Sequence, residues 1–342
     1  MEIGILGLPR SGKSTLFEIM TGIKNHDRHG ESCVRSLATV PDKRFNHLVD
    51  IFQPAKASPA KVSFIDVNVV GERAWNSLRQ NLSGTDGFLH VVDGFSTHDA
   101  QEVVRRYRKL EDELILSDLL IVENRLERLA KMSKKALQPQ DAFQYQLLQK
   151  LKEQLEGGKP IREYGLTTDE IRSLQSFSFW TICPELVVVN TRGDNPFADS
   201  FQVQANLSLP VIGICCSIEK EIAALPEAEQ GDYLSVMGIE ELAFKRIIRM
   251  AFLLLGYISF FTVLGDEVKS WLIPAGSKAL KAAGIIHKDF ARGFIKAEVV
   301  SYDDFVTCGS SFSGARAAGK FRLEGKDYIV KDGDIITFRF NV

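Results

Sequence analysis

Short apolar runs separated by longer amphipathic segments dominate the first three quarters of the chain. The runs are Ile3–Leu6, Val62–Asp66, Phe88–Asp93, Leu186–Asn190 and Val211–Cys215. Near-continuous β-branched runs of this length are typical of central parallel strands that are covered on both faces. Because helical stretches separate these runs, the sequence predicts an α/β fold with a doubly wound sheet and ligand sites at the carboxyl ends of its strands.

A different periodicity interrupts this alternation between residues 100 and 156. Apolar residues step by four and three in one stripe and recur in a second stripe after Pro139, which is ended by Gly157-Gly158. The two stripes consist of Ile115, Leu119, Val122, Leu126 and Leu129, and of Phe143, Leu147, Leu148, Leu151 and Leu155. This pattern predicts an antiparallel, coiled-coil-like helical hairpin projecting from the sheet domain. A helix near 168–176 then returns the chain to the sheet, and residues 239–255 form a closing helix.

From Tyr257 the chain changes to short β-rich segments with many glycines, ending in the alternating run Asp334–Phe340. This texture predicts a small β-rich domain. The expected organisation is therefore an α/β sheet domain over 1–99 and 181–256, a helical insertion over 100–180, and a last domain over 257–342.

Composition narrows the class of protein. The net charge of −2 gives no overall attraction to nucleic acid or membrane, so we expect no DNA partner, and any RNA contact must come from local patches. The 5 cysteines lack regular spacing, which excludes a disulfide framework or a zinc site and suits the cytoplasm. The amino terminus does not have the pattern of a signal peptide, and no apolar run approaches the ~20 residues of a membrane span.

The most informative stretch is Gly7-Leu8-Pro9-Arg10-Ser11-Gly12-Lys13-Ser14, which fits the phosphate-loop pattern G-x-x-x-x-G-K-[ST] without mismatch. A predicted strand precedes it and a predicted helix follows it, which places backbone N–H groups and the positive helix end around one anion. The alternative is an accidental glycine-rich turn. We expect the phosphate contacts to come from Arg10, Ser11, Gly12, Lys13, Ser14 and Thr15.

Two side chains are candidates for holding Mg²⁺. The hydroxyl of Ser14 is in the position that ligates the ion in phosphate loops, and Asp66 ends a strand where a carboxylate of the metal shell is needed. The alternative for Asp66 is a turn residue at a strand end. No general base is visible in the sequence, and we assign no catalytic residue.

Candidate base contacts lie at the ends of the last two apolar runs. Asn190 is where the N-K-x-D motif of GTPases would begin, but the run reads Asn190-Thr191-Arg192-Gly193-Asp194, so Gly193 stands at the carboxylate position. Asp194 would serve only in a bulged loop. Cys216 and Ser217 follow the next run and are candidates for a base edge, although a plain turn fits them equally. Four histidines show no metal spacing with a carboxylate or thiol, and we interpret them as incidental: His26, His29, His90 and His287.

Basic side chains suggest two surfaces for RNA. The hairpin carries Arg105, Arg106, Arg108, Lys109, Arg125, Arg128, Lys131, Lys134 and Lys135, with acidic residues interleaved. A solvated helix with i,i+4 ion pairs explains them as well as RNA phosphate contacts do. The last domain mixes Lys278, Lys281, Lys288, Arg292 and Lys296 with Phe290 and Phe294, which suits RNA unless the phenylalanines are core residues.

The chain resembles the YchF family of Obg-related phosphate-loop NTPases over almost its whole length. The resemblance is carried by Gly7–Phe17, Val40–Arg44, Glu113–Leu119, Ser259–Val263, Glu267-Val268, Ala282–His287, Asp289-Phe290, Gly293–Val299 and Glu324–Asp334. It implies a carboxy-terminal TGS domain, a β-grasp module associated with RNA and ribosome contact. It also implies binding of ATP or GTP with Mg²⁺, slow hydrolysis and association with ribosomes.

The chain departs from this family where the family senses the γ-phosphate and chooses the base. The N-Y-P-F-x-T segment is replaced near Asn25–Gly30, and D-x-x-G reads Asp66-Val67-Asn68-Val69. Gly193 stands where the family has Glu in N-x-x-E. Two hypotheses follow: a slow NTPase whose nucleotide state regulates ribosome or RNA association, or a non-hydrolysing adaptor that acts through its helical and TGS surfaces.

Overall fold

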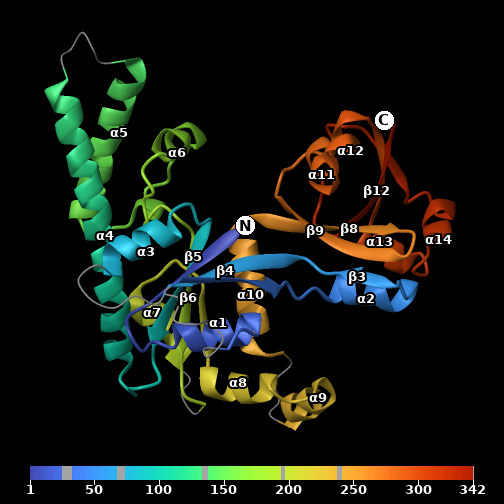
Figure 1. The fold of residues 1–342 in the computed structure, drawn as a ribbon, viewed down its shortest axis with the longest axis horizontal. Coiled ribbons are helices and arrows are strands. Elements are labelled where there is room, and N and C mark those ends of the chain that lie inside the picture. The colour runs from blue at the N-terminus through green and yellow to red at the C-terminus, as the bar shows by residue number, and fades with distance from the viewer. Residues whose placement is uncertain (25–32, 68–73, 133–137, 194–196, 237–240, 342) are drawn as a thin grey trace. The chain divides into compact units, whose positions relative to one another are not determined.

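The computed structural model describes residues 1–24, 33–67, 74–132, 138–193, 197–236 and 241–341. The chain divides into two compact units (Figure 1). The first contains Met1–Ser36 and Ser63–Ile247, and the second contains Leu37–Val62 and Ile248–Val342. This division differs from the expected domains. Residues 37–62 belong with the carboxy-terminal unit rather than with the phosphate loop, residues 100–180 belong to the first unit, and the second unit resumes at Ile248 rather than at Tyr257.

A six-stranded sheet forms the centre of the first unit, in the order β2-β4-β1-β5-β6-β7. The pairs β4/β1, β1/β5, β5/β6 and β6/β7 are parallel. All six residues of β6 are buried, as expected for a strand covered on both faces. The strands are β1 (Glu2–Leu6), β2 (Cys33–Thr39), β4 (Lys61–Val67), β5 (Gly87–Asp93), β6 (Glu185–Asn190) and β7 (Val211–Ile214).

The five strands predicted from apolar runs are therefore confirmed to within one residue at each end, whereas β2 was not predicted. Its burial alternates irregularly between buried and exposed positions, which removes the apolar run that marks the other strands. The helices of this unit include α1 (Lys13–Thr21), α3 (Ala74–Leu82), α7 (Phe197–Ala205), α8 (Cys216–Ala223), α9 (Glu227–Val236) and α10 (Ala243–Leu254), the last of which continues into the second unit.

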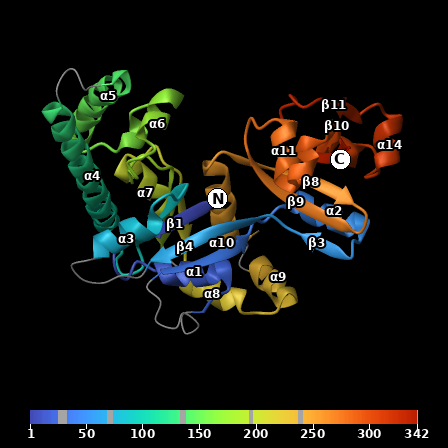
Figure 2. The same cartoon turned by 45° about the horizontal axis from the view of Figure 1, so that its top comes forward.

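The helical hairpin consists of α4 (Ala100–Lys131) and α5 (Pro139–Glu156), which lie side by side and extend beyond the sheet (Figures 1 and 2). Pro139 is the first residue of α5, where its missing N–H costs nothing, and Gly157 caps the helix end. Most seam residues are buried in one cluster, but Phe143 is 44% exposed, so its predicted place in the seam is wrong. The return passes through η2 (Ile161–Glu163) and α6 (Thr168–Leu174).

The second unit is built on a mixed sheet in the order β11-β10-β12-β8-β9-β3. β8/β9, β10/β12 and β10/β11 are antiparallel, whereas β12/β8 and β3/β9 are parallel. The strands are β3 (Lys56–Ser58), β8 (Tyr257–Leu264), β9 (Glu267–Pro274), β10 (Phe294–Ser301), β11 (Arg322–Glu324) and β12 (Asp334–Phe340). The helices are α2 (Lys43–Phe52), α11 (Ala279–Ile286), α12 (Lys288–Arg292), α13 (Tyr302–Thr307) and α14 (Phe312–Ala317).

Residues 37–62 belong to this unit because α2 and β3 pack on it. Phe45 and Leu48 of α2 share a buried cluster with Phe261 and Phe305. The Arg44 guanidinium donates a 2.7 Å hydrogen bond to the Asp332 carboxylate. No helix among the described residues is long and apolar enough to cross a membrane.

Candidate functional site

The loop between β1 and α1 holds the candidate phosphate site. Gly12, directly before α1, has a φ of 99°, and Arg10 has a φ of 65°. Both values lie in the left-handed region, which a non-glycine residue such as Arg10 adopts only at a cost of about 1 kcal/mol or more. The backbone therefore turns sharply before the helix, so that the first N–H groups of α1 open onto the loop.

Close contacts explain why glycine is needed at two loop positions. A Cβ atom on Gly12 would lie 2.5 Å from Nδ2 of Asn190, and one on Gly7 would lie 2.4 Å from the carbonyl oxygen of Val91. Both distances are far shorter than carbon contacts allow. The loop therefore lies directly against the ends of β5 and β6, where a parallel sheet places its ligands.

Lys13 points back into the loop. Its Nζ donates hydrogen bonds of 2.7 Å and 2.9 Å to the carbonyl oxygens of Gly7 and Leu8. Burial lowers the pKa of this ammonium, and the negative charge of Asp66 partly opposes that effect. An anion bound in the loop would offer the ammonium a stronger, charged acceptor than two carbonyl groups.

Asp66 is placed beside the loop by the sheet. It is 1% exposed, and in the parallel pairing of β1 with β4 it stands opposite Ile5. A carboxylate is costly to bury unless a positive charge compensates it, and here the Lys13 ammonium interacts with it electrostatically. A carboxylate oxygen together with a loop hydroxyl such as that of Ser14 is a donor set that suits Mg²⁺. These residues therefore fit the predicted ion.

Asn190 joins three segments that are distant in the sequence. Its side-chain Nδ2 donates to the carbonyl oxygen of Ser11 at 3.1 Å, and its Oδ1 accepts from the backbone N–H of Cys216 at 3.2 Å. The predicted positions Ser11, Asn190 and Cys216 are thus brought together. In these bonds Asn190 holds the backbone around the loop, and both of its polar side-chain atoms are used there.

The side chain of Ile218 blocks the space next to Gly193. A Cβ atom at this position would lie 2.5 Å from Cδ1 of Ile218 on α8. The space where a longer residue would begin is therefore occupied by an apolar side chain. Asp194, the other carboxylate considered for base recognition, lies outside the described residues, as do Asn25–Gly30 and residues 68–73 of the departing segments.

A cavity of about 510 Å³ adjoins the phosphate loop. Its lining includes Pro9 and Arg10 from the loop, His90 from β5 and Asn190 from β6. The Arg10 side chain is exposed, and it makes no ion pair or hydrogen bond within the part of the chain that the structure describes. The Arg10 guanidinium, which has no counter-ion among the described residues, therefore stands beside the candidate phosphate site.

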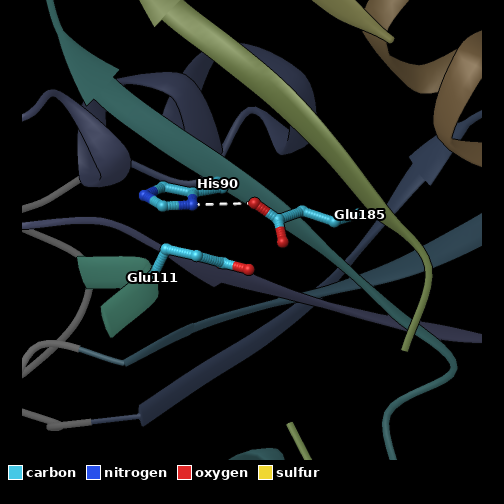
Figure 3. A group of neighbouring side chains, drawn as sticks. All are labelled: His90, Glu111 and Glu185. Carbon is cyan, nitrogen blue, oxygen red and sulfur yellow. Dashed lines mark hydrogen bonds and ion pairs between the residues drawn. The ribbon is translucent and has the colours of Figure 1, made fainter. Parts of the chain in front are cut away.

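His90, which lines this cavity, also belongs to a buried polar cluster that the sequence did not predict (Figure 3). Nδ1 of His90 lies 2.8 Å from a carboxylate oxygen of Glu185 on β6, and the carboxylate of Glu111 on α4 lies close to both residues. The Arg162 guanidinium bonds to the carboxylates of both Glu111 and Glu185. The ring of Tyr107 lies 4.8 Å from that of His90.

The cluster already contains its own cation. One ligand atom of each of His90, Glu111 and Glu185 lies within 4.8 Å of the others, which is close enough for a metal site. However, Arg162 bridges the two carboxylates and supplies the positive charge that a metal would bring. Burial and the neighbouring charge of Glu185 raise the pKa of Glu111 to about 7, despite Arg162. The interpretation of His90 as incidental is therefore wrong.

The predicted RNA surfaces are largely engaged within the protein. On α4, Arg105 and Arg106 pair with Glu102, and Arg125 pairs with Asp141 of α5. In the second unit, Phe290 and Phe294 pack against the hydrophobic core. Lys134 and Lys135 lie outside the described residues. Ion pairing and core packing thus explain many of these side chains.

Comparison with known proteins assigns the family. The chain is 36% identical to the "Ribosome-binding ATPase YchF" of Haemophilus influenzae, over 100% of this chain and 99% of that protein. It is also 36% identical to the protein of the same name from Bacillus subtilis, over the full length of both. The chain belongs to the YchF family. It is 35% identical to the "Obg-like ATPase 1" of Oryza sativa subsp. japonica, over 100% of this chain and 92% of that protein.

Two further comparisons agree with this assignment. Residues 257–341 match the family model YchF-GTPase_C, described as "Protein of unknown function (DUF933)". The fold matches the structure of the Schizosaccharomyces pombe YchF GTPase with a TM-score of 0.85 at 25% identity, covering 99% of this chain and 97% of that one. The α/β fold with its long helix is therefore that of the YchF family.

Proposed function

We propose that this YchF-family protein binds ATP or GTP with Mg²⁺ at the loop between β1 and α1, hydrolyses it slowly, and associates with the ribosome according to its nucleotide state. One observation supports the nucleotide site above all others. Gly12, Lys13 and Asn190 arrange the loop so tightly that a Cβ at Gly12 would collide with Asn190. A glycine held at a φ of 99° directly before the helix leaves the first backbone N–H groups of α1 open to an anion, which is what phosphate binding requires.

Each residue has a distinct role in this proposal. Backbone N–H groups of Arg10–Thr15 surround the phosphates, and Lys13 exchanges its carbonyl partners for the outer phosphates. Ser14 and Asp66 hold Mg²⁺, which would neutralise phosphate charge and orient the outer phosphates. Ser217 and the segment around Cys216 line the side where the base would lie. Slow hydrolysis by positioning and charge stabilisation is expected, because no general base is assigned.

The ribosome is the proposed partner because two relatives carry the name "Ribosome-binding ATPase YchF". We infer that residues 257–342 form the TGS domain that the family resemblance implies, and that this domain and the hairpin provide the contact surfaces. This partner would place the protein in the cytoplasm.

The test is Lys13→Ala, studied by calorimetric titration with ATP, ADP, GTP and GDP and by co-sedimentation with ribosomes. Loss of nucleotide binding together with a changed ribosome association would support nucleotide control. Lys220→Ala is a suitable control, because Lys220 lies in the same unit but pairs with Glu18 at 2.9 Å outside the loop. Unchanged ribosome association in a Lys13→Ala protein that has lost its nucleotide would refute nucleotide control.

The adaptor is the second candidate, and the contact between Gly193 and Ile218 favours it. Gly193 replaces the glutamate that selects the base in the family, and the Ile218 side chain occupies the space that a longer residue would need. Similar affinities for all four nucleotides would mean that only the phosphate loop contributes. No binding of any nucleotide would leave the adaptor as the function.

A further inference from the structure

Among the described residues, only His90 belongs both to the buried polar cluster and to the cavity beside the phosphate loop. The loop contributes Leu8, Pro9 and Arg10 to the lining of the same cavity. In the pairing of β1 with β5, His90 stands opposite Leu6, the residue directly before the loop. The His90 side chain therefore lies near the start of the loop, on a cavity that the loop itself borders.

The two ring nitrogens of His90 have different surroundings (Figure 3). Nδ1 lies 2.8 Å from the Glu185 carboxylate, whereas Nε2 points away from Glu185. Nε2 has no hydrogen-bond partner among the described residues, and it keeps a small surface that water can reach. Since His90 is only 1% exposed and lines the cavity, this surface opens onto the cavity.

Glu185 determines which nitrogen carries the proton. Burial opposes ionisation of this carboxyl, but the charge of Arg162 and the hydrogen bond from His90 outweigh it and lower the pKa of Glu185. An ionised carboxylate only accepts hydrogen bonds, so the proton of the neutral imidazole is assigned to Nδ1, and Nε2 keeps its lone pair. A carboxylate in this position orients the ring and stabilises the imidazolium that forms when the ring takes up a proton.

The carboxylates that border the cavity are already engaged. Asp93 accepts a 2.6 Å hydrogen bond from Arg106 and two more from backbone N–H groups. Glu102 pairs with both Arg105 and Arg106. Each carboxylate is thus stabilised in its charged form, which makes it a weak base. Among the described residues of the cavity, His90 is therefore the neutral base with an unengaged lone pair.

We propose that His90 is the general base of the nucleotide hydrolysis proposed above, and that the proton of the attacking water reaches its Nε2 through water in this cavity. The oxygen of the attacking water bonds to the terminal phosphorus. The bond from this phosphorus to the bridging oxygen breaks, and its electron pair leaves with the nucleoside diphosphate. The proton stays on the imidazolium, held by Glu185, until it returns to solvent. This role rests on the proposed function, because a base is needed only if nucleotide is hydrolysed at the loop.

The first test compares His90→Gln with the wild type in single-turnover hydrolysis of ATP and GTP. Glutamine has a similar size and can still donate to Glu185, but it is not a base. General bases contribute about 10²–10⁴-fold, and phosphoryl transfer needs little help of this kind, so we expect the rate to fall about 100-fold. Calorimetric titration should show that the affinity for ADP changes by less than about twofold, because the base acts only in the reaction.

Chemical rescue separates a base from a residue that only supports the fold. His90→Ala leaves room for a small ring, and imidazole and pyrazole have the same size, but pyrazole is a far weaker base. Added imidazole should raise the rate of His90→Ala about tenfold, and pyrazole should leave it unchanged. Tyr107→Phe is the matched control, because the ring of Tyr107 lies 4.8 Å from that of His90 but does not line the cavity. This variant should keep the wild-type rate and not respond to imidazole.

A His90→Gln protein that hydrolyses nucleotide at the wild-type rate would refute the general base, and so would equal rescue by imidazole and pyrazole. If His90→Ala does not fold, the rate of His90→Gln decides. Failure of the proposed function is a different result, because the wild type itself would then bind no nucleotide. A wild type that binds nucleotide without hydrolysing it would refute the general base while leaving the nucleotide site in place.

Discussion

Two glycines of the first unit share a left-handed backbone but differ in their surroundings. Gly12 has a φ of 99° and Gly84 a φ of 83°. A Cβ at Gly12 would meet Asn190 at 2.5 Å, whereas nothing lies within 4 Å of a Cβ at Gly84. Substituting alanine at each position therefore separates the energetic cost of backbone strain from the cost of a steric clash.

We expect Gly84→Ala to lower the free energy of unfolding by about 1 kcal/mol, the cost of strain alone. Gly12→Ala should lower it by roughly 2–4 kcal/mol, because the bond from Asn190 to Ser11 must also shift. Urea unfolding of the nucleotide-free proteins measures both. Equal losses of unfolding free energy in the two variants would mean that Asn190 moves aside without cost and does not hold the loop in place.

Arg10 has a strained backbone conformation and a side chain that is positioned to act on a bound phosphate. It adopts a φ of 65° and lines the cavity beside the phosphate loop. A guanidinium in this position would stabilise charge that develops on a transferring phosphoryl group. We expect Arg10→Gln to reduce single-turnover hydrolysis of ATP or GTP by at least about tenfold, with little change in the affinity for ADP.

Arg172→Ala is the control for Arg10→Gln, because Arg172 lies on α6 and pairs only locally with Asp169. A rate unchanged by Arg10→Gln would remove the guanidinium from the reaction. A parallel loss of ADP affinity would instead make it a ground-state contact.

Residues of the loop could be proposed from the sequence because they are consecutive in the chain. Gly12, Lys13 and Ser14 lie within one short motif whose spacing alone indicates the chemistry. His90 could not be predicted, because its partners Glu111 and Glu185 come from other elements and are joined only by the tertiary fold. The roles of the loop residues themselves stay predictions.

At the scale of elements, the apolar periodicity predicted the hairpin but misplaced one of its residues. The inward position at the start of α5 is taken by Gln144, which is 8% exposed. Its side chain accepts from Arg125 at 2.9 Å and donates to the carbonyl oxygen of Ser173 at 3.0 Å. A polar residue with specific partners thus faces inward, and Phe143 next to it faces outward. A periodicity based on hydrophobicity alone cannot identify such an exchange.

The buried cluster joins β5, β6, α4 and η2, and it makes this junction sensitive to pH. The pKa of Glu111 rises from 4.5 to about 7 in the folded protein, because of burial and of the charge on Glu185. The pKa of Glu185 is lowered instead, since Arg162 and the hydrogen bond from His90 outweigh the effect of burial. Between about pH 5 and pH 8, Glu111 is therefore the carboxyl group of this pair that changes its charge.

A raised pKa in the folded state means that the folded protein binds the proton more tightly than the unfolded chain does. The resulting stabilisation is fully present below about pH 4.5 and is lost as the pH rises through about 7. The rise of the pKa from 4.5 to about 7 corresponds to roughly 3–4 kcal/mol. We expect the free energy of unfolding to fall between about pH 4.5 and pH 7.5, and Glu111→Gln to remove most of this fall. Urea titrations of the wild type and of Glu111→Gln across this pH range provide the measurement. Identical pH profiles of the two proteins would contradict the role of Glu111.

At the scale of the whole molecule, the sequence order of the elements concealed how they are divided. Residues 37–62 run from the end of β2 to the start of β4, which are both strands of the first sheet, and yet α2 and β3 are part of the second unit. Their pairing with β9 and their burial against Phe261 come from contacts more than 200 residues apart. No local pattern indicates such contacts, so the sequence places the start of the last domain at Tyr257 and does not assign residues 37–62 to it.

Hydrogen exchange tests this division. Leu48 of α2 is fully buried with Phe261, Val268 and Phe305, so Leu48→Ala should cost about 2–5 kcal/mol. Because cooperative units open together, the loss should appear as faster exchange in β8, β9 and β12, with little change in β5 and β6.

Leu16→Ala on α1, a deletion of the same size in the first unit, should give the opposite pattern, since Leu16 is also fully buried. Suppose instead that Leu48→Ala speeds exchange in β1 and β5 and leaves β8 unchanged. Residues 37–62 would then draw their stability from the first unit, and the boundary expected from the sequence would be the correct one.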